Sequence, residues 1–411
     1  MKGQKKYLSL LLPVSQKSRT GSGWRVVSLI FFIVLTAGCQ PSPEEKPLSQ
    51  EKPSKLAKLF QPFRIPHTEK GESKVFNFFY ATTRKAKESE DPLIPYGSDL
   101  DEQLRSGMFK IQLFPKRNLK GNSPKKWKGI KVMELQEQQE DVFFDQLQNA
   151  VESSPYNSLF IVVFGYRNTF SNAVLKTAKL SLRVDLNTPV LVFDWPGDQT
   201  LSVSGYNRAF SFAKKSGPHL GELISTIIDR VKPKKLWLGG GSLGTQVICN
   251  AFAQMMKHTD LADREPEIDH VILAAPDVGD DEFERQFKDE IAALSKKLTA
   301  YVAADDKALL LSGWVHGGSR LGKSRTESQK QFEEMIDLLE LKEEGAKNIT
   351  VIDITPVNRA TLGHTFYVES SEFFDDVYQR LMFDSEMVGR RLYRKNYAKG
   401  VSYWVLRDDG E

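Results

Sequence analysis

One serine in the chain stands between glycines in a pattern that favours nucleophilic chemistry. Ser242 is the centre of the sequence GGSLG at residues 240–244. An apolar run at 235–240 precedes it, and residues 245–258 follow it with apolar side chains at helical spacing. A tight strand-to-helix turn needs small residues on both sides of the serine, and it pushes the hydroxyl into the open. The pattern therefore predicts a nucleophile elbow, with the N-terminus of the next helix beside it.

Two other uses of a glycine-rich turn fit this stretch less well. A phosphate-binding P-loop ends in Gly-Lys-Ser/Thr, and no such sequence follows here. A dinucleotide site needs an acidic residue at the end of the next strand, whereas that strand, 270–276, has the sequence HVILAAP. The nucleophilic serine is therefore the preferred interpretation.

A serine of this kind needs a base, and the base needs an orienting carboxylate. Around such an elbow the order along the chain is serine, acid, histidine. His364 lies ten residues beyond the last apolar run, 348–354, and follows a glycine, so it is the expected base. His316 lies in a glycine-rich loop and is kept as a pocket candidate. The remaining histidines precede the serine, end the following helix or open a strand: His67, His219, His258 and His270.

Carboxylates follow two of the strands that come after the serine. Asp305 and Asp306 follow the second of these strands, and Asp277 follows the first. The acid usually follows the second strand, so we expect Asp306 to orient the histidine, with Asp305 and Asp277 as alternatives. Asp277 also precedes a helical stretch and is suited to capping it.

An oxyanion needs two N–H donors. The residue after the serine, Leu243, supplies one, and the loop FGYRNTF at 164–170 supplies the other, for which we expect the N–H of Tyr166. Further candidates for lining the pocket, besides His316, are Phe164, Arg167, Trp195 and Gly241.

The elements that position these residues are short apolar runs separated by helical patterns. Continuous runs of this kind are typical of strands buried on both faces in a parallel sheet. We expect such strands at 159–164, 189–195, 235–240, 270–276, 299–305 and 348–354, and helices at 172–185, 206–231, 245–258 and 282–296. Earlier strands are expected at 75–84 and 107–115, with loops at 85–103 and 119–129, the latter a possible hairpin turn. This alternation predicts a three-layer α/β fold with an N-terminal β-containing extension.

The composition argues against several other classes of protein. The 411 residues carry a net charge of +4 with both signs mixed, which gives no reason to expect a nucleic-acid partner. The two cysteines, Cys39 and Cys249, lie in dissimilar contexts, so neither a disulfide nor a metal site is expected, and no cofactor is implied.

The N-terminus predicts export and lipid attachment. An apolar run of 12 residues, 26–37, follows basic residues and ends in LTAGC at Cys39. This length suits a signal peptide better than a membrane-spanning helix, and the small residues before the cysteine resemble a bacterial lipobox. An uncleaved anchor is the alternative. We expect a lipid-anchored protein of the cell envelope, and Gln40 weakly favours the outer membrane.

These features divide the chain into a signal peptide (1–39), a flexible linker (40–73) and one domain (74–411). The linker is rich in Pro, Ser, Glu and Lys. Within the domain we expect an N-terminal extension at 74–150 and a catalytic core at 151–411.

Several stretches together resemble a bacterial α/β-hydrolase family with esterase-like features, the domain of unknown function 900. They are FFYATTR, GYRNTFSNAVLKTAKL, VLVFDWPG, GGSLG, ILAAPDVGDDEF, AYVAADDKALLLSGWVHGGSRLG, LGHTFY and GVSYWVL. The resemblance implies the α/β-hydrolase fold and the catalytic residues Ser242, Asp306 and His364.

The chain departs from this family beside the serine. Phe164 and Arg167 stand where the family has histidine and asparagine, and Gly241 stands where it has histidine. We therefore expect an empty space beside Ser242 and a changed substrate range or rate.

The expected function is a serine hydrolase that cleaves small carboxylic esters through an acyl-enzyme. One alternative is a catalytically weakened hydrolase fold with a binding or assembly role at the membrane. Another is a peptidase or thioesterase that uses the same three residues. The sequence does not indicate an oligomeric state.

Overall fold

The computed structural model describes residues 73–121, 123–257, 265–309, 349–360, 363–383, 392–396 and 402–407. The predicted signal peptide with Cys39, nearly all of the linker, and His316 lie outside these residues.

The described strands form one sheet of 11 strands in the order β10-β11-β9-β8-β7-β6-β4-β5-β1-β2-β3. Its centre is parallel and consists of β4 (Ser158–Val163), β5 (Val190–Asp194), β6 (Lys235–Gly241), β7 (His270–Ala274), β8 (Leu298–Val302) and β9 (Ile349–Asp353). These six strands coincide with the six predicted apolar runs.

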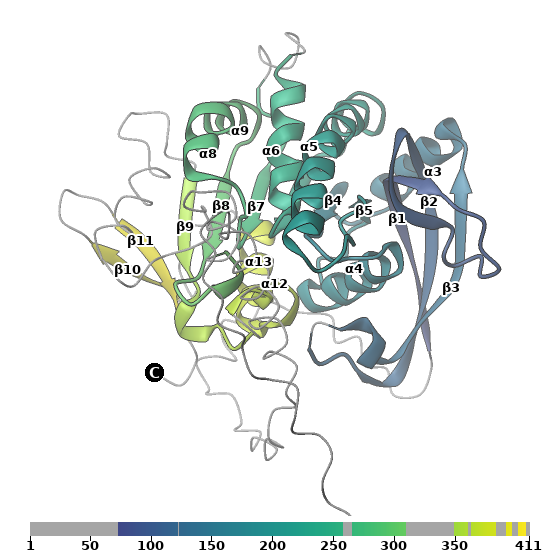
Figure 1. Cartoon of the computed structure of the whole chain (residues 1–411), viewed down its shortest axis with the longest axis horizontal. Coiled ribbons are helices and arrows are strands. Elements are labelled where there is room, and N and C mark those ends of the chain that lie inside the picture. Colours follow the sequence, from purple (N-terminus) through teal and green to yellow (C-terminus); the bar gives the residue numbers. More distant parts are fainter. Residues whose placement is uncertain are drawn as a thin grey trace, which may run out of the picture.

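Antiparallel strands extend the sheet at both edges (Figure 1). At one edge, β1 (Lys74–Ala86) runs parallel to β5 and pairs antiparallel with β2 (Tyr96–Asn118), which pairs with β3 (Lys128–Gln138). At the other edge, β11 (Ser402–Leu406) runs parallel to β9 and pairs antiparallel with β10 (Leu392–Asn396). The N-terminal extension thus belongs to the same sheet as the central strands.

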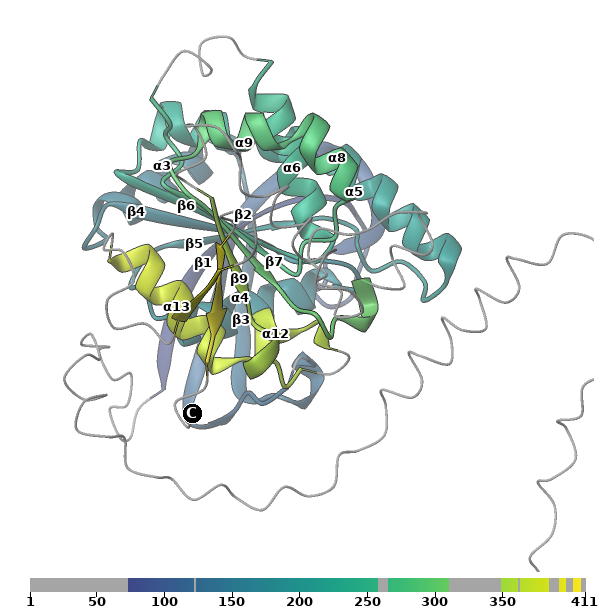
Figure 2. The same cartoon turned by 90° about the vertical axis from the view of Figure 1, so that its left-hand side faces the viewer.

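Helices cover both faces of the sheet (Figure 2). One face carries α3 (Glu140–Glu152), α5 (Val203–Thr226), α6 (Gly244–Met255), α8 (Asp280–Gln286) and α9 (Lys288–Leu294). The other carries α4 (Phe170–Val184), α12 (Phe366–Glu369) and α13 (Ser371–Met382). The predicted three-layer α/β fold with a mostly parallel sheet is confirmed.

The strand sequences explain why both faces are covered. In β4, Leu159 and Ile161 point into the core under α5 and α6, while Phe160 and Val162 point into the core under α4 and α13. Each side chain is at most 3% exposed. A strand buried on both faces needs apolar residues at every position, and this produces the continuous apolar runs.

The structure corrects two local predictions. The segment 85–103, predicted as a loop, enters β2 at Tyr96, because this strand pairs with the end of β1 through Ala86↔Tyr96 and Arg84↔Leu100. Because the side chains of this segment are mostly polar, no apolar strand pattern predicted the hairpin. The single helix predicted at 282–296 is two helices, because Phe287 leaves helical geometry and its side chain is buried.

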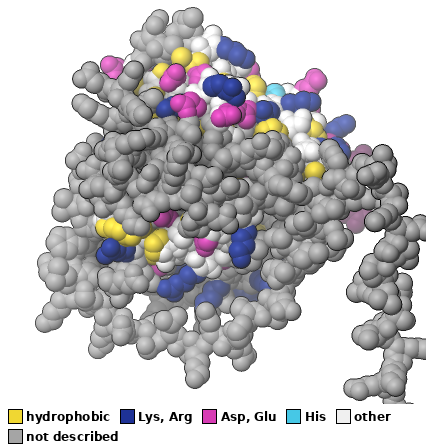
Figure 3. Space-filling model, turned by 60° about the vertical axis from the view of Figure 1, so that its left-hand side comes forward, with side chains coloured by type: hydrophobic (Ala, Val, Ile, Leu, Met, Phe, Trp, Pro, Cys, Tyr) yellow, Lys and Arg dark blue, Asp and Glu magenta, His cyan; other side chains and the backbone are white. Residues whose placement is uncertain are grey.

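The described residues contain no helix long and apolar enough to cross a membrane. On the face shown in Figure 3, acidic and basic side chains of the described residues lie next to one another. Cys249 on α6 is buried and has a free thiol.

Candidate active site

The strand-to-helix turn at Ser242 has the strained geometry predicted for it. The serine has φ +54°, a left-handed conformation that side chains disfavour. A Cβ on Gly240 would lie 2.5 Å from Ile248 Cδ1, and one on Gly244 would lie 2.6 Å from the Val163 carbonyl oxygen. These two glycines let β6, α6 and the end of β4 pack closely enough to hold the turn. Ser242 N–H donates to the Ala274 carbonyl at 2.9 Å, which attaches the turn to β7.

Ser242, His364 and Asp306 form one chain of hydrogen bonds. His364 Nε2 lies 2.7 Å from Ser242 Oγ, and His364 Nδ1 lies 2.7 Å from Asp306 Oδ2. With the imidazole proton on Nδ1, that nitrogen donates to the carboxylate and Nε2 accepts from the serine hydroxyl. The structure thus brings together three residues that lie 122 and 58 positions apart in the sequence.

The Asp306 carboxylate is fully buried and held on both oxygens. Oδ2 contacts His364, and Oδ1 accepts the N–H groups of Ala308 at 3.1 Å and Leu309 at 3.0 Å. The carboxylate therefore has one orientation, and that orientation positions the imidazole. Burial alone would lower the pKa of His364, but the charge and hydrogen bond of Asp306 outweigh it and raise that pKa above its usual 6.5.

The neighbouring Asp305 has a different role. Its Oδ1 accepts from Asn358 Nδ2 at 2.9 Å, and the same amide donates to the Gly363 carbonyl at 2.7 Å. Gly363 has φ +69°, and a Cβ there would lie 2.4 Å from the Asp305 carbonyl oxygen. Asp305 and Asn358 therefore fasten the loop that carries His364 to the loop that carries Asp306. No sequence pattern marks Asn358 for this role.

Asp277 lies beside the elbow but is engaged elsewhere. It is 3% exposed, its Oδ2 accepts from the Tyr206 hydroxyl at 2.5 Å, and its N–H donates to Thr245 Oγ1 at 3.1 Å. It forms part of the site's wall on the α5 side, and its charge adds to the increase in the pKa of His364. The carboxylate on Nδ1 is Asp306, not Asp277 or Asp305.

The loop that carries one expected oxyanion donor, Tyr166, lies against the residue that carries the other, Leu243. A Cβ on Gly165 would lie 2.6 Å from Ser242 Cβ and 3.1 Å from Leu243 N, so the Gly165–Tyr166 backbone approaches the elbow directly. Among the described residues, neither the Tyr166 nor the Leu243 N–H is used in a backbone hydrogen bond of a turn, loop or cap. Leu243 is also the N-cap of α6, whose partial positive charge favours an anion there.

A network of buried polar groups holds the loop that contains Tyr166. Trp195 Nε1 donates to the Phe164 carbonyl at 2.7 Å, and Asn168 Nδ2 donates to the Gly165 carbonyl at 2.7 Å. Lys176 Nζ donates to Asn168 Oδ1 at 2.6 Å, and burial lowers the pKa of this lysine to about 8. Trp195, predicted as a pocket residue, therefore stabilises the loop through its hydrogen bond to the Phe164 carbonyl.

Arg84 ties this loop to the N-terminal hairpin. The arginine at the end of the FFYATTR stretch is fully buried, and all five of its N–H donors have acceptors. These are Asp194 Oδ2 (2.6 Å), Asp198 Oδ1 (2.5 Å) and the carbonyls of Gly97 (2.9 Å), Asn168 (2.6 Å) and Trp195 (2.7 Å). The guanidinium therefore links β1 and β2 to the end of β5 and to the Tyr166 loop.

The structure explains two of the departures from the family pattern. Arg167 is exposed with φ +64°, a conformation that asparagine adopts more readily than arginine, and its N–H donates to the Gly197 carbonyl at 2.7 Å. Its backbone rather than its side chain shapes the loop. Phe164 is 6% exposed and borders an apolar cavity.

The expectation of an empty space beside Ser242 is wrong. A Cβ on Gly241 would lie 2.4 Å from Cε2 of Tyr367, so the tyrosine ring occupies that space. The ring is 9% exposed and lies edge-on to the His364 imidazole at 6.2 Å between centroids. Tyr367 belongs to the LGHTFY stretch, but no residue pattern pointed to this contact.

The described residues include no cluster of three or more His, Cys, Asp or Glu side chains arranged to hold a metal ion.

Comparisons with known proteins give one family match. The model of the family described as "Alpha/beta hydrolase of unknown function (DUF900)" matches residues 138–383. Among solved structures, the chain is similar to "a novel cold-adapted esterase from an Arctic intertidal metagenomic library", whose structure is described as zinc bound. The two chains share 11% sequence identity with a TM-score of 0.35, and the match covers 75% of this chain and 94% of the other. No curated protein sequence matches the chain.

Proposed function

The chain belongs to the α/β-hydrolase family of unknown function DUF900, and we propose that it is a serine hydrolase that cleaves small carboxylic esters. The observation that carries this proposal is the unbroken hydrogen-bond chain from Ser242 Oγ through the His364 imidazole to Asp306. A serine, an imidazole and a buried carboxylate in this arrangement suit acyl transfer.

In the first half of the reaction, Ser242 Oγ attacks the ester carbonyl carbon. The hydroxyl proton passes to His364 Nε2, and Asp306 stabilises the resulting imidazolium. The carbonyl oxygen becomes an oxyanion, which accepts hydrogen bonds from the N–H groups of Tyr166 and Leu243. When the tetrahedral intermediate collapses, the C–O bond to the alcohol breaks, and the imidazolium protonates the leaving oxygen.

In the second half, water takes the place of the alcohol. His364 removes a proton from water as the water oxygen attacks the acyl-enzyme. The bond to Ser242 Oγ breaks, the imidazolium returns a proton to the serine, and the carboxylic acid leaves. The same oxyanion donors and the N-terminus of α6 stabilise the oxyanion that forms in each half of the reaction.

The completeness of this arrangement favours catalysis over a purely binding role. A weakened enzyme would be expected to lack a donor, misplace the base or leave the acid unpaired. Here both imidazole nitrogens are hydrogen-bonded at 2.7 Å, and the carboxylate is fixed by two further N–H groups. The departures at Phe164, Arg167 and Gly241 leave this chain of contacts intact.

Replacement of the serine tests the proposal. Wild-type protein should hydrolyse p-nitrophenyl acetate or butyrate and should be labelled by a fluorophosphonate probe. Ser242→Ala should lose the label and about 10³–10⁶-fold in kcat, because the nucleophile is removed. Ser204→Ala, at an exposed position at the start of α5, is the matched control and should behave as wild type. Equal labelling of wild type and Ser242→Ala would overturn the assignment.

A further inference from the structure

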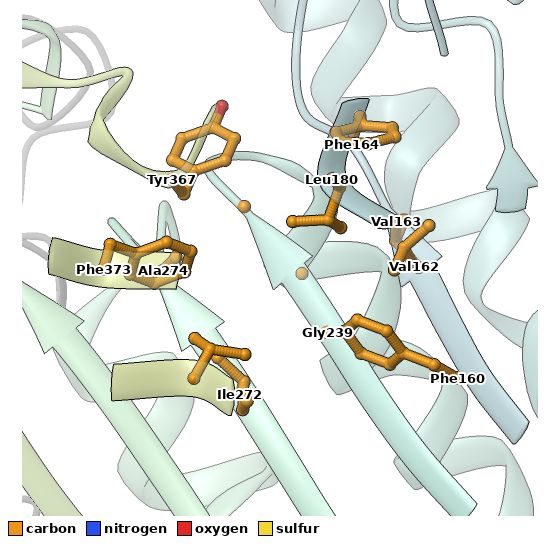
Figure 4. Close-up of a pocket in the computed structure, with 13 residues that line it drawn as sticks. Phe160, Val162, Val163, Phe164, Leu180, Gly239, Ile272, Ala274, Tyr367 and Phe373 are labelled. Carbon is orange, nitrogen blue, oxygen red and sulfur yellow. The ribbon is translucent and has the colours of Figure 1, made fainter. Parts of the chain in front are cut away.

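An apolar cavity lies beneath the elbow, between the sheet and the helices α4, α12 and α13. It has a volume of about 40 Å³ and is bordered on the sheet side by residues of β4, β6 and β7. Figure 4 shows Phe160 and Ile272 further back along the strands, and Phe164 and Tyr367 near their carboxyl ends. The Tyr367 hydroxyl points away from the cavity, so the surface facing the interior consists of hydrocarbon and aromatic groups.

Glycines on one face of β6 create this space. Gly239 and Gly241 alternate with Gly240, so they face the cavity while Gly240 faces Ile248 of α6. The elbow needs Gly240 and Gly244 for close packing, but it does not require a glycine at 239. Gly239 borders the cavity, and a Cβ there would lie 3.0 Å from the Phe160 ring, so a side chain at this position would press on that ring.

The end of the cavity nearest the catalytic edge is formed by neighbours of the reacting groups. Phe164 directly precedes Gly165 of the Tyr166 loop, and Gly241 directly precedes Ser242. Tyr367 follows His364 by three residues, and its ring lies against Gly241. The Tyr367 ring therefore lies at the end of the cavity nearest Ser242.

We propose that this cavity binds the hydrocarbon end of the acyl group and that Tyr367 forms its roof. The inference rests on the proposed function and names its substrate class: esters of short, straight-chain carboxylic acids. The Tyr367 ring turns aside to admit the chain and closes the cavity when it is empty. An apolar cavity of about 150 Å³ holds one benzene molecule, so this one accommodates one or two carbons beyond the α-carbon, and an acyl group of about four carbons fits best.

A chain-length series on enlarged cavities tests this inference. kcat/KM is measured for p-nitrophenyl acetate, butyrate, hexanoate, octanoate and decanoate. Wild type should prefer butyrate. Ile272→Ala deepens the cavity, so its preference should move to hexanoate or octanoate, with the octanoate-to-butyrate ratio rising about tenfold.

Leu273→Ala is the matched control. Leu273 is the next residue on β7, is equally buried, and faces the opposite core, under α6 and α9. It should lose comparable stability but keep the wild-type chain-length profile. Leu180→Ala, which removes a part-buried lining residue on α4, should shift the profile in the same direction as Ile272→Ala, and it decides the matter if Ile272→Ala does not fold.

The possible outcomes separate the two proposals. If wild type hydrolyses esters but the Ile272→Ala and Leu180→Ala profiles match wild type, the cavity does not bind the acyl chain and the hydrolase assignment stands. The same shift in Leu273→Ala would likewise overturn the acyl pocket. If wild type hydrolyses no ester of the series and takes no fluorophosphonate label, both proposals fail.

Discussion

Two adjacent aspartates illustrate how the site is decided at the scale of single residues. Asp305 and Asp306 follow the same strand, yet only Asp306 reaches His364, while Asp305 binds Asn358 on the loop that carries the histidine. Burial raises the pKa of Asp305, which is partly exposed. The sequence favours this pair over Asp277. Which partner each of the two aspartates contacts depends on the path of the loop that follows β8.

The pH dependence of the reaction is a prediction at this scale. The base must be neutral, and Asp306 holds the pKa of His364 above 6.5. Activity should therefore rise with pH, with the midpoint of the acidic limb above 6.5. In Asp306→Asn the charge is gone, so the midpoint should move to lower pH while kcat falls by about 10²–10⁴-fold. The profile of kcat/KM against pH measures both effects, because it reports the free enzyme.

Asp305→Asn is the matched control for this experiment. It removes a carboxylate one residue away that does not contact the imidazole. Its acidic limb should coincide with that of wild type. A limb that moves in Asp305→Asn but not in Asp306→Asn would contradict the assignment of the acid.

At the scale of elements, the N-terminal hairpin supports the catalytic edge rather than standing apart from it. Arg84, near the end of β1, reaches the Asn168 carbonyl in the Tyr166 loop and the Asp194 carboxylate at the end of β5. Both side chains of the Arg84–Asp194 pair are at most 2% exposed. An isolated charge at this depth is costly, so the pair holds three elements in register as long as both partners are present.

Replacement of Arg84 should therefore be costly in two ways. Arg84→Met leaves Asp194 without its main partner and should lower the free energy of unfolding by about 3–5 kcal/mol. It should also slow ester hydrolysis, because the Tyr166 loop loses an anchor. Denaturant titration followed by fluorescence measures the first effect, and kcat at a temperature where the protein is folded measures the second.

Arg208→Met is the comparison for Arg84→Met. Arg208 pairs with Asp99 at 2.7 Å, but both side chains are more than half exposed. Its loss should change the free energy of unfolding by less than about 1 kcal/mol and leave kcat unaltered. Equal effects of the two substitutions would show that the buried network has no special role.

At the scale of the whole molecule, the sheet gathers the three residues of the proposed catalytic triad at one edge. Ser242, Asp306 and His364 all follow the carboxyl ends of parallel strands, β6, β8 and β9, where loops from neighbouring strands converge. The helices that cover both faces leave this edge as the place where backbone N–H groups and side chains meet. The apolar cavity lies behind this edge, against β4, β6 and β7.

Membrane attachment through Cys39 is a separate prediction at this scale. In a bacterial host, the full chain should sediment with membranes and incorporate labelled palmitate, because lipidation buries acyl chains in the bilayer. Cys39→Ala should abolish incorporation and shift the protein towards the soluble fraction, with ester hydrolysis retained. Cys249→Ala, which removes a buried thiol, should still be labelled. Palmitate incorporation that persists in Cys39→Ala would contradict the prediction.

The sequence by itself determined the layered fold, because strands buried on both faces must be apolar throughout, and it located the elbow through glycines that only a close turn requires. It also led to His364 by chain order and to Asp306 as the expected acid. Only the tertiary structure decided what Asp305 binds, what fills the space at Gly241, and what Arg84 holds. Those outcomes depend on contacts between segments far apart in the chain, such as Tyr367 against Gly241 and Arg84 against Asp194, and no local pattern encodes them.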